Sequence, residues 1–367
     1  MYGRKKKMSK LQKLRAAMAE KGFDAVIITS EVNQRYITGF NYQDGLVLVT
    51  ATHAVLITDF RYIEAAKASK AADEFEIVTP DKRQSLYCYD IIKDCSAKTV
   101  AVEEATISLS LYETFVKVCE GCEVKGGASA IIDKLREFKD ADEIASTAKA
   151  QDIADAAFKH IIEFIRPDMT EIDVALELEF FMRAHGAEST AFDTIAVSGK
   201  ASSLPHGEPR NVQLEKGFLT MDYGAKVDGY CSDMTRTIVI GKADDDMKRL
   251  YNPVLEAQLA ALAAMKPGAL CREMDKIARD IIDGAGYVGR FGHSLGHGVG
   301  MYIHEAPGLS QKVMPEDRKL TPGHIVTCEP GIYIEGKYGC RIEDMVAVLE
   351  DGILNFTHSP KELIEIY

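Results

Sequence analysis

The sequence changes its pattern part-way along the chain, and this change restricts the fold more than any other feature. From residue 9 to about residue 130, short apolar runs of the kind found in strands alternate with helical patterns. The expected strands are 25–28, 47–49, 55–57 and 99–102, and the expected helices lie near 62–69, 82–94 and 108–118. Such alternation is typical of an α/β layer with a largely buried mixed sheet.

The rest of the chain has a different character. Helical patterns cover about 132–166, 171–185, 244–265 and 271–283. From residue 192 onward, the segments outside these helices are β-type runs separated by glycines. A chain of 367 residues corresponds to about two domains of ordinary size. We therefore expect an N-terminal α/β domain over residues 1–131 and an α+β domain over residues 132–367.

The amino-terminal segment is basic. Residues 1–7 resemble the start of a signal peptide, but lysine and arginine interrupt the segment that follows, which argues against export by this route. We expect residues 1–7 to be a basic leader or an upstream extension. Met8 can serve as a second start, and Ser9 is typical of an N-cap for a helix that runs to about Lys21.

The composition excludes several classes of function. There are 44 basic and 56 acidic residues, and the net charge of −12 argues against binding to nucleic acid or to anionic membranes. No stretch reaches the ~18 apolar residues that a membrane span requires. Eight cysteines are too sparse for a disulfide scaffold in a chain of this length. Cys119 and Cys122 have metal-site or redox spacing but no second pair nearby, so we expect reduced thiols and a cytoplasmic location.

Two familiar motifs lie in unsuitable contexts. Segment 284–289 matches the dinucleotide fingerprint G-x-G-x-x-G, but a helical pattern precedes it where the fingerprint needs a strand. This pattern is typical of a turn that ends a helix. Segment 292–296 matches the nucleophile elbow G-x-S-x-G, which offers an alternative function, a serine hydrolase that uses Ser294, Asp344 and His358. The glycines that follow Ser294 disfavour the helix that such an elbow must open.

A predicted β-hairpin brings two aspartates together. The Asp228-Gly229 pair between two β-type runs is a strong two-residue turn signal. If the residues that flank this turn pair with each other, Asp222 lies opposite Thr235 and Asp233 lies opposite Gly224. The two aspartates then share one face as diagonal neighbours, about 7–8 Å apart at the backbone. Two carboxylates on one buried face repel each other without a cation, so this register favours a shared metal, provided that no bulge shifts it.

Further candidate ligands follow in the second part of the chain. Glu329 and Glu343 occupy β-type contexts, and a glutamate in an apolar run just before Pro330-Gly331 is an unusual structural choice. Several histidines could supply a nitrogen ligand. They are His206, His293, His297 and His304. Four carboxylates with one or two imidazoles suit Mn²⁺, Co²⁺ or Fe²⁺ better than a closed structural zinc site.

Together these residues resemble the pita-bread metallopeptidase family, which includes methionine aminopeptidase, aminopeptidase P, prolidase and creatinase. The motifs are M-D-Y-G-A at 221–225, Y-C-S-D-M-T-R-T at 230–237, G-H-G-V-G at 296–300, H-E-A-P at 304–307, C-E-P-G-I-Y at 328–333 and R-I-E-D at 341–344. Six separate motifs in one order are highly specific. The resemblance spans nearly the whole chain and implies a creatinase/prolidase-type N-terminal domain before an α+β pita-bread catalytic domain.

The resemblance implies a dinuclear metal site. The metal ligands would be Asp222, Asp233, His297, Glu329 and Glu343. Asp233 and Glu343 would bridge two divalent ions, for which manganese is the first choice and cobalt, iron and zinc are alternatives. A hydroxide bridging the two ions would attack the carbonyl that precedes proline, and Glu329 would accept the proton of the attacking water.

The resemblance also assigns roles to residues beyond the ligands. His206 and His304 would be catalytic residues that stabilise the tetrahedral oxyanion or the leaving group. His304 would also contact the substrate, and His293 would line the proline pocket. Arg341 would either contact a substrate carboxylate or orient the neighbouring Glu343.

Two shorter patterns narrow the implied activity. The segments S-S-L-P-H-G at 202–207 and D-F-R-Y at 59–62 resemble bacterial Xaa-Pro peptidases of the dipeptidase (prolidase) or aminopeptidase P type. This implies hydrolysis of the N-terminal Xaa-Pro bond of dipeptides or short peptides, and family analogy implies a homodimer. A non-catalytic peptide-binding pseudoenzyme is the remaining alternative, although such a protein would normally have lost a ligand and none is missing here.

Overall fold

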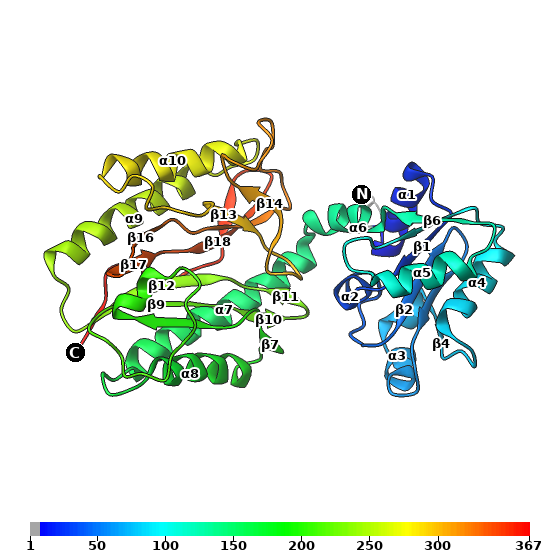
Figure 1. Ribbon diagram of the computed structural model, residues 1–367, viewed down its shortest axis with the longest axis horizontal. Helices are drawn as coiled ribbons and strands as arrows, with labels where there is room; N and C mark the ends of the chain where they lie inside the picture. The colour runs from blue at the N-terminus through cyan, green and yellow to red at the C-terminus, as the bar shows by residue number, and fades with distance from the viewer. Residues whose placement is uncertain (1–7) are drawn as a thin grey trace, which may run out of the picture. The chain divides into compact units, whose positions relative to one another are not determined.

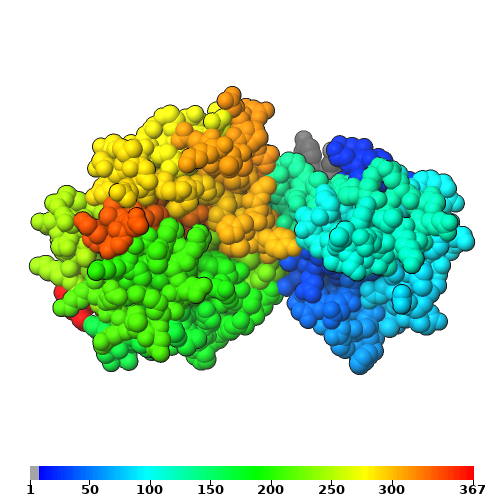
Figure 2. All heavy atoms as spheres, in the orientation of Figure 1, coloured from blue at the N-terminus to red at the C-terminus, as the bar shows by residue number. Residues whose placement is uncertain are grey.

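The chain forms two compact units in a computed structural model that describes residues 8–367 (Figure 1). The first unit ends at Arg136, and the second covers Glu137–Tyr367. The division lies near the end of a helix, a few residues after the boundary expected at 131. The expected basic leader, residues 1–7, lies outside the described residues. The surface of each unit can be followed by its colours in Figure 2.

The first unit is an α/β layer. Its six-stranded sheet has the order β4-β3-β2-β1-β5-β6, in which β1 is antiparallel to β2 and parallel to β5. The strands are β1 Ala25–Ile28, β2 Leu46–Thr50, β3 Ala54–Ile57, β4 Glu76–Val78, β5 Thr99–Val102 and β6 Glu123–Gly126. The helices are α1 Lys10–Lys21, α2 Glu31–Thr38, α3 Ile63–Ala68, α4 Gln84–Asp94, α5 Leu109–Val118 and α6 Ala128–Glu137. The predicted mixed sheet is confirmed.

Helix α2 and two strands of this unit were not predicted, and the two strands have weak sequence signals. Strands β4 and β6 form the two edges of the sheet, where most of their side chains are partly or fully exposed. They therefore lack the apolar runs that identify the four central strands, which are almost entirely buried. The predicted N-cap is confirmed, because the Ser9 side chain accepts a hydrogen bond from the backbone N–H of Gln12 at the start of α1.

The second unit encloses its sheets between two pairs of helices. Helices α7 and α8 lie on one side in Figure 1, and α9 and α10 lie on the other. They span α7 Ala141–Phe164, α8 Glu171–Ala184, α9 Asp245–Ala264 and α10 Cys271–Gly284. The larger sheets have the orders β20-β12-β9-β8 and β14-β13-β15-β18-β19, and the smaller ones β11-β10-β7 and β16-β17.

The strands of the second unit are short and mostly buried. They are β7 Ser189–Thr190, β8 Ile195–Ser198, β9 Gly217–Tyr223, β10 Ala225–Val227, β11 Tyr230–Cys231, β12 Met234–Ile240, β13 Gly296–Gly298, β14 Glu305–Leu309, β15 Ile325–Cys328, β16 Gly331–Ile334, β17 Tyr338–Arg341, β18 Asp344–Val348, β19 Ile353–Asn355 and β20 Glu365–Ile366. One apolar core packs α7 and α8 against β9 and β12, and another packs α9 and α10 against β15 and β18.

One predicted helix is two helices. The expected helical segment 132–166 is interrupted, since α6 ends at Glu137 and α7 begins at Ala141. Asp140 is the N-cap of α7, and its side chain and that of Glu143 form a reciprocal capping box. The break therefore has a physical cause that is readable in the sequence as Asp-x-x-Glu.

The predicted turn near residue 284 and the predicted reduced thiols agree with the structure. Segment 284–289 follows α10 as a turn, as predicted, and Gly286 and Gly289 have positive φ. All eight cysteines are free thiols. None of the helices within residues 8–367 is long and apolar enough to cross a lipid bilayer.

Candidate metal centre

The two aspartates of the predicted hairpin lie where the register places them. Strands β9 and β12 are antiparallel, with Asp222 opposite Thr235, and β10 pairs with β11 across the Asp228-Gly229 turn in the same register. Asp233 directly precedes β12. The predicted register is confirmed, and it places both aspartates on one face of the hairpin.

The two glutamates and one histidine come from a second sheet. Glu329 directly follows β15 and Glu343 directly precedes β18, and these strands pair so that Cys328 lies opposite Asp344. Both glutamates therefore lie at the same end of one strand pair. His297 is the middle residue of β13, which pairs with β15. The five side chains thus come from strand ends and strands of two sheets.

These side chains converge on one point. The Nε2 atom of His297 lies 3.5 Å from Asp233 Oδ2 and 3.4 Å from Glu329 Oε1. One ligand atom each from Asp233, His297 and Glu343 lies within 4.8 Å of the others. Such a group of oxygen and nitrogen atoms has the dimensions of a cation site.

The convergent side chains line a cavity of about 470 Å³. All nine residues that the sequence analysis placed in the metal or substrate site lie in its wall. They are His206, Asp222, Asp233, His293, His297, His304, Glu329, Arg341 and Glu343. Other parts of the wall are lined by apolar residues, among them Phe192, Ile195 and Ile303. The cavity therefore has both charged side chains and apolar surfaces that can contact an apolar ring.

The carboxyl groups have the electrostatic properties expected of ligands to a cation. Burial raises the pKa of Asp233 and of Glu343 well above their usual range. Repulsion by Glu343 adds to the rise for Asp233, and repulsion by Glu329 and Asp222 adds to the rise for Glu343. Burial raises the pKa of Glu329 to about 8. Asp222 Oδ1 and Glu343 Oε1 are buried and have no hydrogen-bond partner among the described residues. Buried carboxylate oxygen atoms without a hydrogen-bond partner fit divalent ions, which would balance their negative charge.

The histidine is prepared to act as a neutral ligand. Burial, together with the neighbouring His304, lowers the pKa of His297 to about 4. Its Nδ1 atom lies 3.1 Å from the carbonyl oxygen of Gly298, which places the ring proton on Nδ1. The lone pair on Nε2 then faces Asp233 and Glu329, which is the tautomer that a metal ligand requires.

Arg341 links the ligands from both sheets. Its Nη2 atom donates to Asp222 Oδ2 at 2.6 Å, and its Nε atom donates to Thr235 Oγ1 at 2.9 Å. Thr235 in turn donates to Glu343 Oε2 at 2.7 Å. Arg341 thus contacts Asp222 directly, and it reaches Glu343 through the hydroxyl of Thr235.

Both parts of the chain match known families. Residues 145–350 match the metallopeptidase family M24, and residues 10–138 match the creatinase/prolidase N-terminal domain. The chain belongs to metallopeptidase family M24. The predicted pita-bread membership and the predicted fold class are therefore confirmed.

Relatives of this M24 chain share its full length. A Xaa-Pro dipeptidase from Pyrococcus furiosus is 38% identical, over 97% of this chain and 99% of the relative. The solved structure of a Xaa-Pro dipeptidase from Bacillus anthracis has a TM-score of 0.92 at 44% identity, covering 97% of this chain and 99% of that one. The X-Pro aminopeptidase from Thermotoga maritima MSB8 has a TM-score of 0.88 at 35% identity, covering 96% and 100%.

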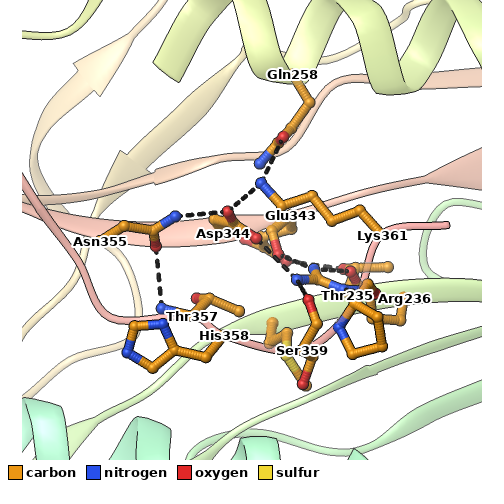
Figure 3. A network of polar contacts seen from close by, with 12 residues as sticks. Thr235, Arg236, Gln258, Glu343, Asp344, Asn355, Thr357, His358, Ser359 and Lys361 are labelled. Atoms are coloured by element: carbon orange, nitrogen blue, oxygen red, sulfur yellow. Dashed lines mark hydrogen bonds and ion pairs between the residues drawn. The ribbon is translucent and has the colours of Figure 1, made fainter. Parts of the chain in front are cut away.

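A buried ion-pair network behind the M24 site was not predicted (Figure 3). Arg236 donates to the carbonyl oxygen of Glu343 and, at 2.9 Å, to Asp344 Oδ1. Lys361 Nζ lies 2.5 Å from the other carboxylate oxygen of Asp344. Burial raises the pKa of Asp344, but the charges of Arg236 and Lys361 lower it more, and the net shift is downward. Arg236 also donates to the carbonyl oxygen of Ser359, so the network ties the backbone at Glu343 to the C-terminal segment.

The arrangement does not assemble the serine-hydrolase alternative. Ser294 lies in the cavity wall, but Asp344 is engaged by the cations of the buried network and His358 is exposed. A strand, β13, begins two positions after Ser294, where the nucleophile elbow would need a helix. Within residues 8–367, no hydrogen bond joins any two of the three side chains.

Two further residues at this M24 site escaped the sequence analysis, Tyr333 behind the lining residues and Thr194 in the wall. The hydroxyl of Tyr333 lies 3.0 Å from His293 Nε2 and accepts a hydrogen bond from Arg341 Nη1 at 2.8 Å. Tyr333 ends the C-E-P-G-I-Y motif, so a signal was present without a role attached to it. Thr194 lines the cavity and is 4% exposed, and its hydroxyl has no partner among the described residues. It belongs to no motif in the sequence.

Proposed function

We propose that this chain is a metal-dependent exopeptidase that hydrolyses the bond between an N-terminal residue and a following proline. The observation that carries the proposal is the convergence of four buried or partly buried carboxyl groups and one imidazole in a single cavity, where two of the carboxylate oxygen atoms have no partner among the described residues. Full-length similarity to a Xaa-Pro dipeptidase and to an X-Pro aminopeptidase supports the choice of substrate.

The proposal includes two divalent ions, with manganese as the first choice and cobalt, iron or zinc as alternatives. The five residues that would hold them are Asp222, Asp233, His297, Glu329 and Glu343. When bound, such ions lower the pKa of water and polarise a carbonyl group. The raised pKa values of the carboxyl groups support this assignment, since these groups bind protons when no other cation is present.

The remaining cavity residues have distinct proposed roles. Glu329 accepts the proton of the attacking water, for which a buried carboxylate beside the reacting atoms is suited. His206 and His304 donate hydrogen bonds to the oxyanion or to the leaving nitrogen. His293, held by Tyr333, lines the proline pocket, and Arg341 holds Asp222 in place.

The compartment and the assembly are also part of the proposal. Eight free thiols and the absence of a membrane-spanning helix within residues 8–367 support a cytoplasmic location. We expect a homodimer without nucleic-acid or membrane partners. Light scattering coupled to size-exclusion chromatography measures the mass in solution, and a mass of one chain would contradict the dimer.

The direct test compares two peptides that differ only at the second residue. Protein stripped with EDTA should cleave neither Ala-Pro-Ala nor Ala-Ala-Ala, and adding Mn²⁺ should restore release of alanine from Ala-Pro-Ala. A serine-directed phosphonate should leave this activity intact. Restored cleavage of Ala-Ala-Ala at the same rate would contradict the proline specificity, and full activity in EDTA would contradict the metal dependence.

A further inference from the structure

The guanidinium group of Arg341 in the cavity wall is almost fully engaged by the protein. Arg341 is the only lysine or arginine among the described residues that line the cavity, and its side chain is 4% exposed. Beyond the bonds to Asp222 and Thr235, its Nη1 atom donates to the carbonyl oxygen of Pro205 at 3.2 Å and to the Tyr333 hydroxyl at 2.8 Å. A guanidinium has five N–H donors, and four of them are committed here. Arg341 therefore has little capacity left to bind a carboxylate of the substrate.

The same wall carries two acidic side chains beyond the proposed metal ligands. Asp193 and Glu208 line the cavity and are exposed, which places them at its solvent-facing edge. Two divalent ions would balance the four carboxylates of the ligand set, but they leave these two charges uncompensated. A negatively charged substrate group close to this edge is therefore disfavoured, because the low-dielectric walls of a cleft concentrate the electric field of the two carboxylates.

The other polar groups of the wall suit a neutral ligand. The histidines of the wall can donate hydrogen bonds to a ligand. A peptide carbonyl can be satisfied by such donors, whereas a carboxylate needs a compensating charge as well.

We propose that this cavity prefers substrates in which the carboxyl group of proline continues as an amide, and that it disfavours free Xaa-Pro dipeptides. Asp193 and Glu208 are the residues that set the preference, through repulsion of the dipeptide carboxylate. The inference rests on the proposed function, because it concerns which Xaa-Pro substrates the same site accepts. It assigns the chain the specificity of an aminopeptidase that acts on longer peptides.

A pair of substrates isolates the charge. Ala-Pro and its carboxamide, Ala-Pro-NH₂, have the same size and release the same alanine, and they differ in the charge on proline. With Mn²⁺-loaded protein at about pH 8 and low ionic strength, kcat/KM for Ala-Pro-NH₂ should exceed that for Ala-Pro on the order of tenfold. Because salt screens exposed charges, the ratio should fall towards one in about 0.5 M KCl.

Variants assign the effect to the two carboxylates. The double variant D193N/E208Q should raise kcat/KM for Ala-Pro relative to that for Ala-Pro-NH₂, so the ratio between the substrates should shrink towards one. Glu256→Gln is the matched control, because Glu256 is exposed on α9, away from the cavity wall, and its loss changes the net charge in the same direction. This control should keep the wild-type ratio.

The outcomes separate this inference from the proposed function. Equal values for the two substrates in the wild type, a preference for Ala-Pro, or an unchanged ratio in the double variant would overturn the inference while Xaa-Pro cleavage stands. Failure of the Mn²⁺-loaded protein to cleave Ala-Pro, Ala-Pro-NH₂ and Ala-Pro-Ala would overturn both.

Discussion

At the scale of single residues, the site concentrates negative charge that the protein does not neutralise by itself. Asp233, Glu329 and Glu343 all have raised pKa values, chiefly because they are buried. Without a metal ion, protons must supply the missing positive charge, so metal binding and proton release are coupled. This coupling makes the pH dependence of the metal-free protein a direct measure of the site.

Metal-free protein should lose stability as the pH rises from about 4.5 to about 8. The pKa of Glu329 is raised from its ordinary value of 4.5 to about 8, so its contribution to stability is fully present below 4.5 and is lost as the pH passes through 8. Thermal unfolding in EDTA measures this loss. Glu329→Gln should flatten the profile between these pH values, and saturating Mn²⁺ should flatten it in the wild type. A profile in Glu329→Gln identical to that of the wild type would contradict the assignment.

Removing the proposed ligand Glu343 should abolish both metal binding and cleavage. Glu343→Ala deletes two carboxylate oxygens from the centre of the cluster, and loss of a direct ligand should cost more than the ~100-fold that loss of an outer partner can cost. Titration calorimetry with Mn²⁺ and turnover of Ala-Pro-Ala measure the two effects. Glu335→Ala changes an exposed glutamate in the β16–β17 turn and should behave like the wild type. Normal turnover of Glu343→Ala would exclude a role in the metal site.

At the scale of secondary-structure elements, the sequence predicted what local register determines. The Asp228-Gly229 turn sets the pairing of β9 with β12, so the relation between Asp222 and Asp233 followed from counting along the hairpin. The convergence of this hairpin with β13, β15 and β18 depends on contacts between distant segments. The bond from Arg341 to Asp222, for example, joins residues 119 positions apart. Neither hydrophobic periodicity nor a turn signal predicts a contact between such distant segments. The common ligand set was predicted only because the six motifs resemble those of a known family.

A structural repeat in the catalytic unit was also invisible in the sequence. Helix α8 runs from Glu171 to Ala184 and α10 from Cys271 to Gly284, an offset of 100 positions, and both have 14 residues. Corresponding positions are buried in the same order but hold different residues. Examples are Leu178 with Ala278 and Met182 with Ile282, all fully buried. Because packing restricts size and polarity more than identity, a shared burial pattern survives without visible sequence similarity.

The network that joins β12, β18 and the C-terminal segment should support both the fold and the metal site. Asp344→Asn leaves the buried Arg236 and the partly buried Lys361 without their anion, which should cost about 3–5 kcal/mol of unfolding free energy. Because Arg236 also binds the carbonyl of Glu343, Mn²⁺ affinity should fall as well. Urea unfolding and Mn²⁺ titration of the folded protein measure the two effects.

A surface ion pair provides the control for this variant. Asp246→Asn breaks an exposed pair with Arg249 on α9 and should cost less than about 1 kcal/mol. Reduced stability of Asp344→Asn with unchanged Mn²⁺ affinity would show that the network supports the fold without positioning the ligand.

At the scale of the whole molecule, the two units differ in role, because the residues proposed to bind metal and substrate all lie in one of them. The first unit has its own apolar core, and every residue of the proposed metal site comes from the second. Because ligand binding stabilises only the structure that forms the site, the metal should act on the two units unequally. We therefore expect Mn²⁺ to stabilise the second unit more than the first.

Hydrogen exchange with and without Mn²⁺ should resolve this difference. A free Mn²⁺ concentration of about 100 times Kd stabilises the folded site by about 2.7 kcal/mol, which slows exchange through unfolding of the catalytic unit by roughly 100-fold. We expect this protection within 137–367, strongest in β9, β12, β15 and β18, whose ends carry four of the proposed ligands. Exchange within 8–136 should not change, because none of the proposed ligands belongs to this unit, which has its own apolar core. Equal protection of both units would show that they unfold together, and no protection of either would remove the metal site itself.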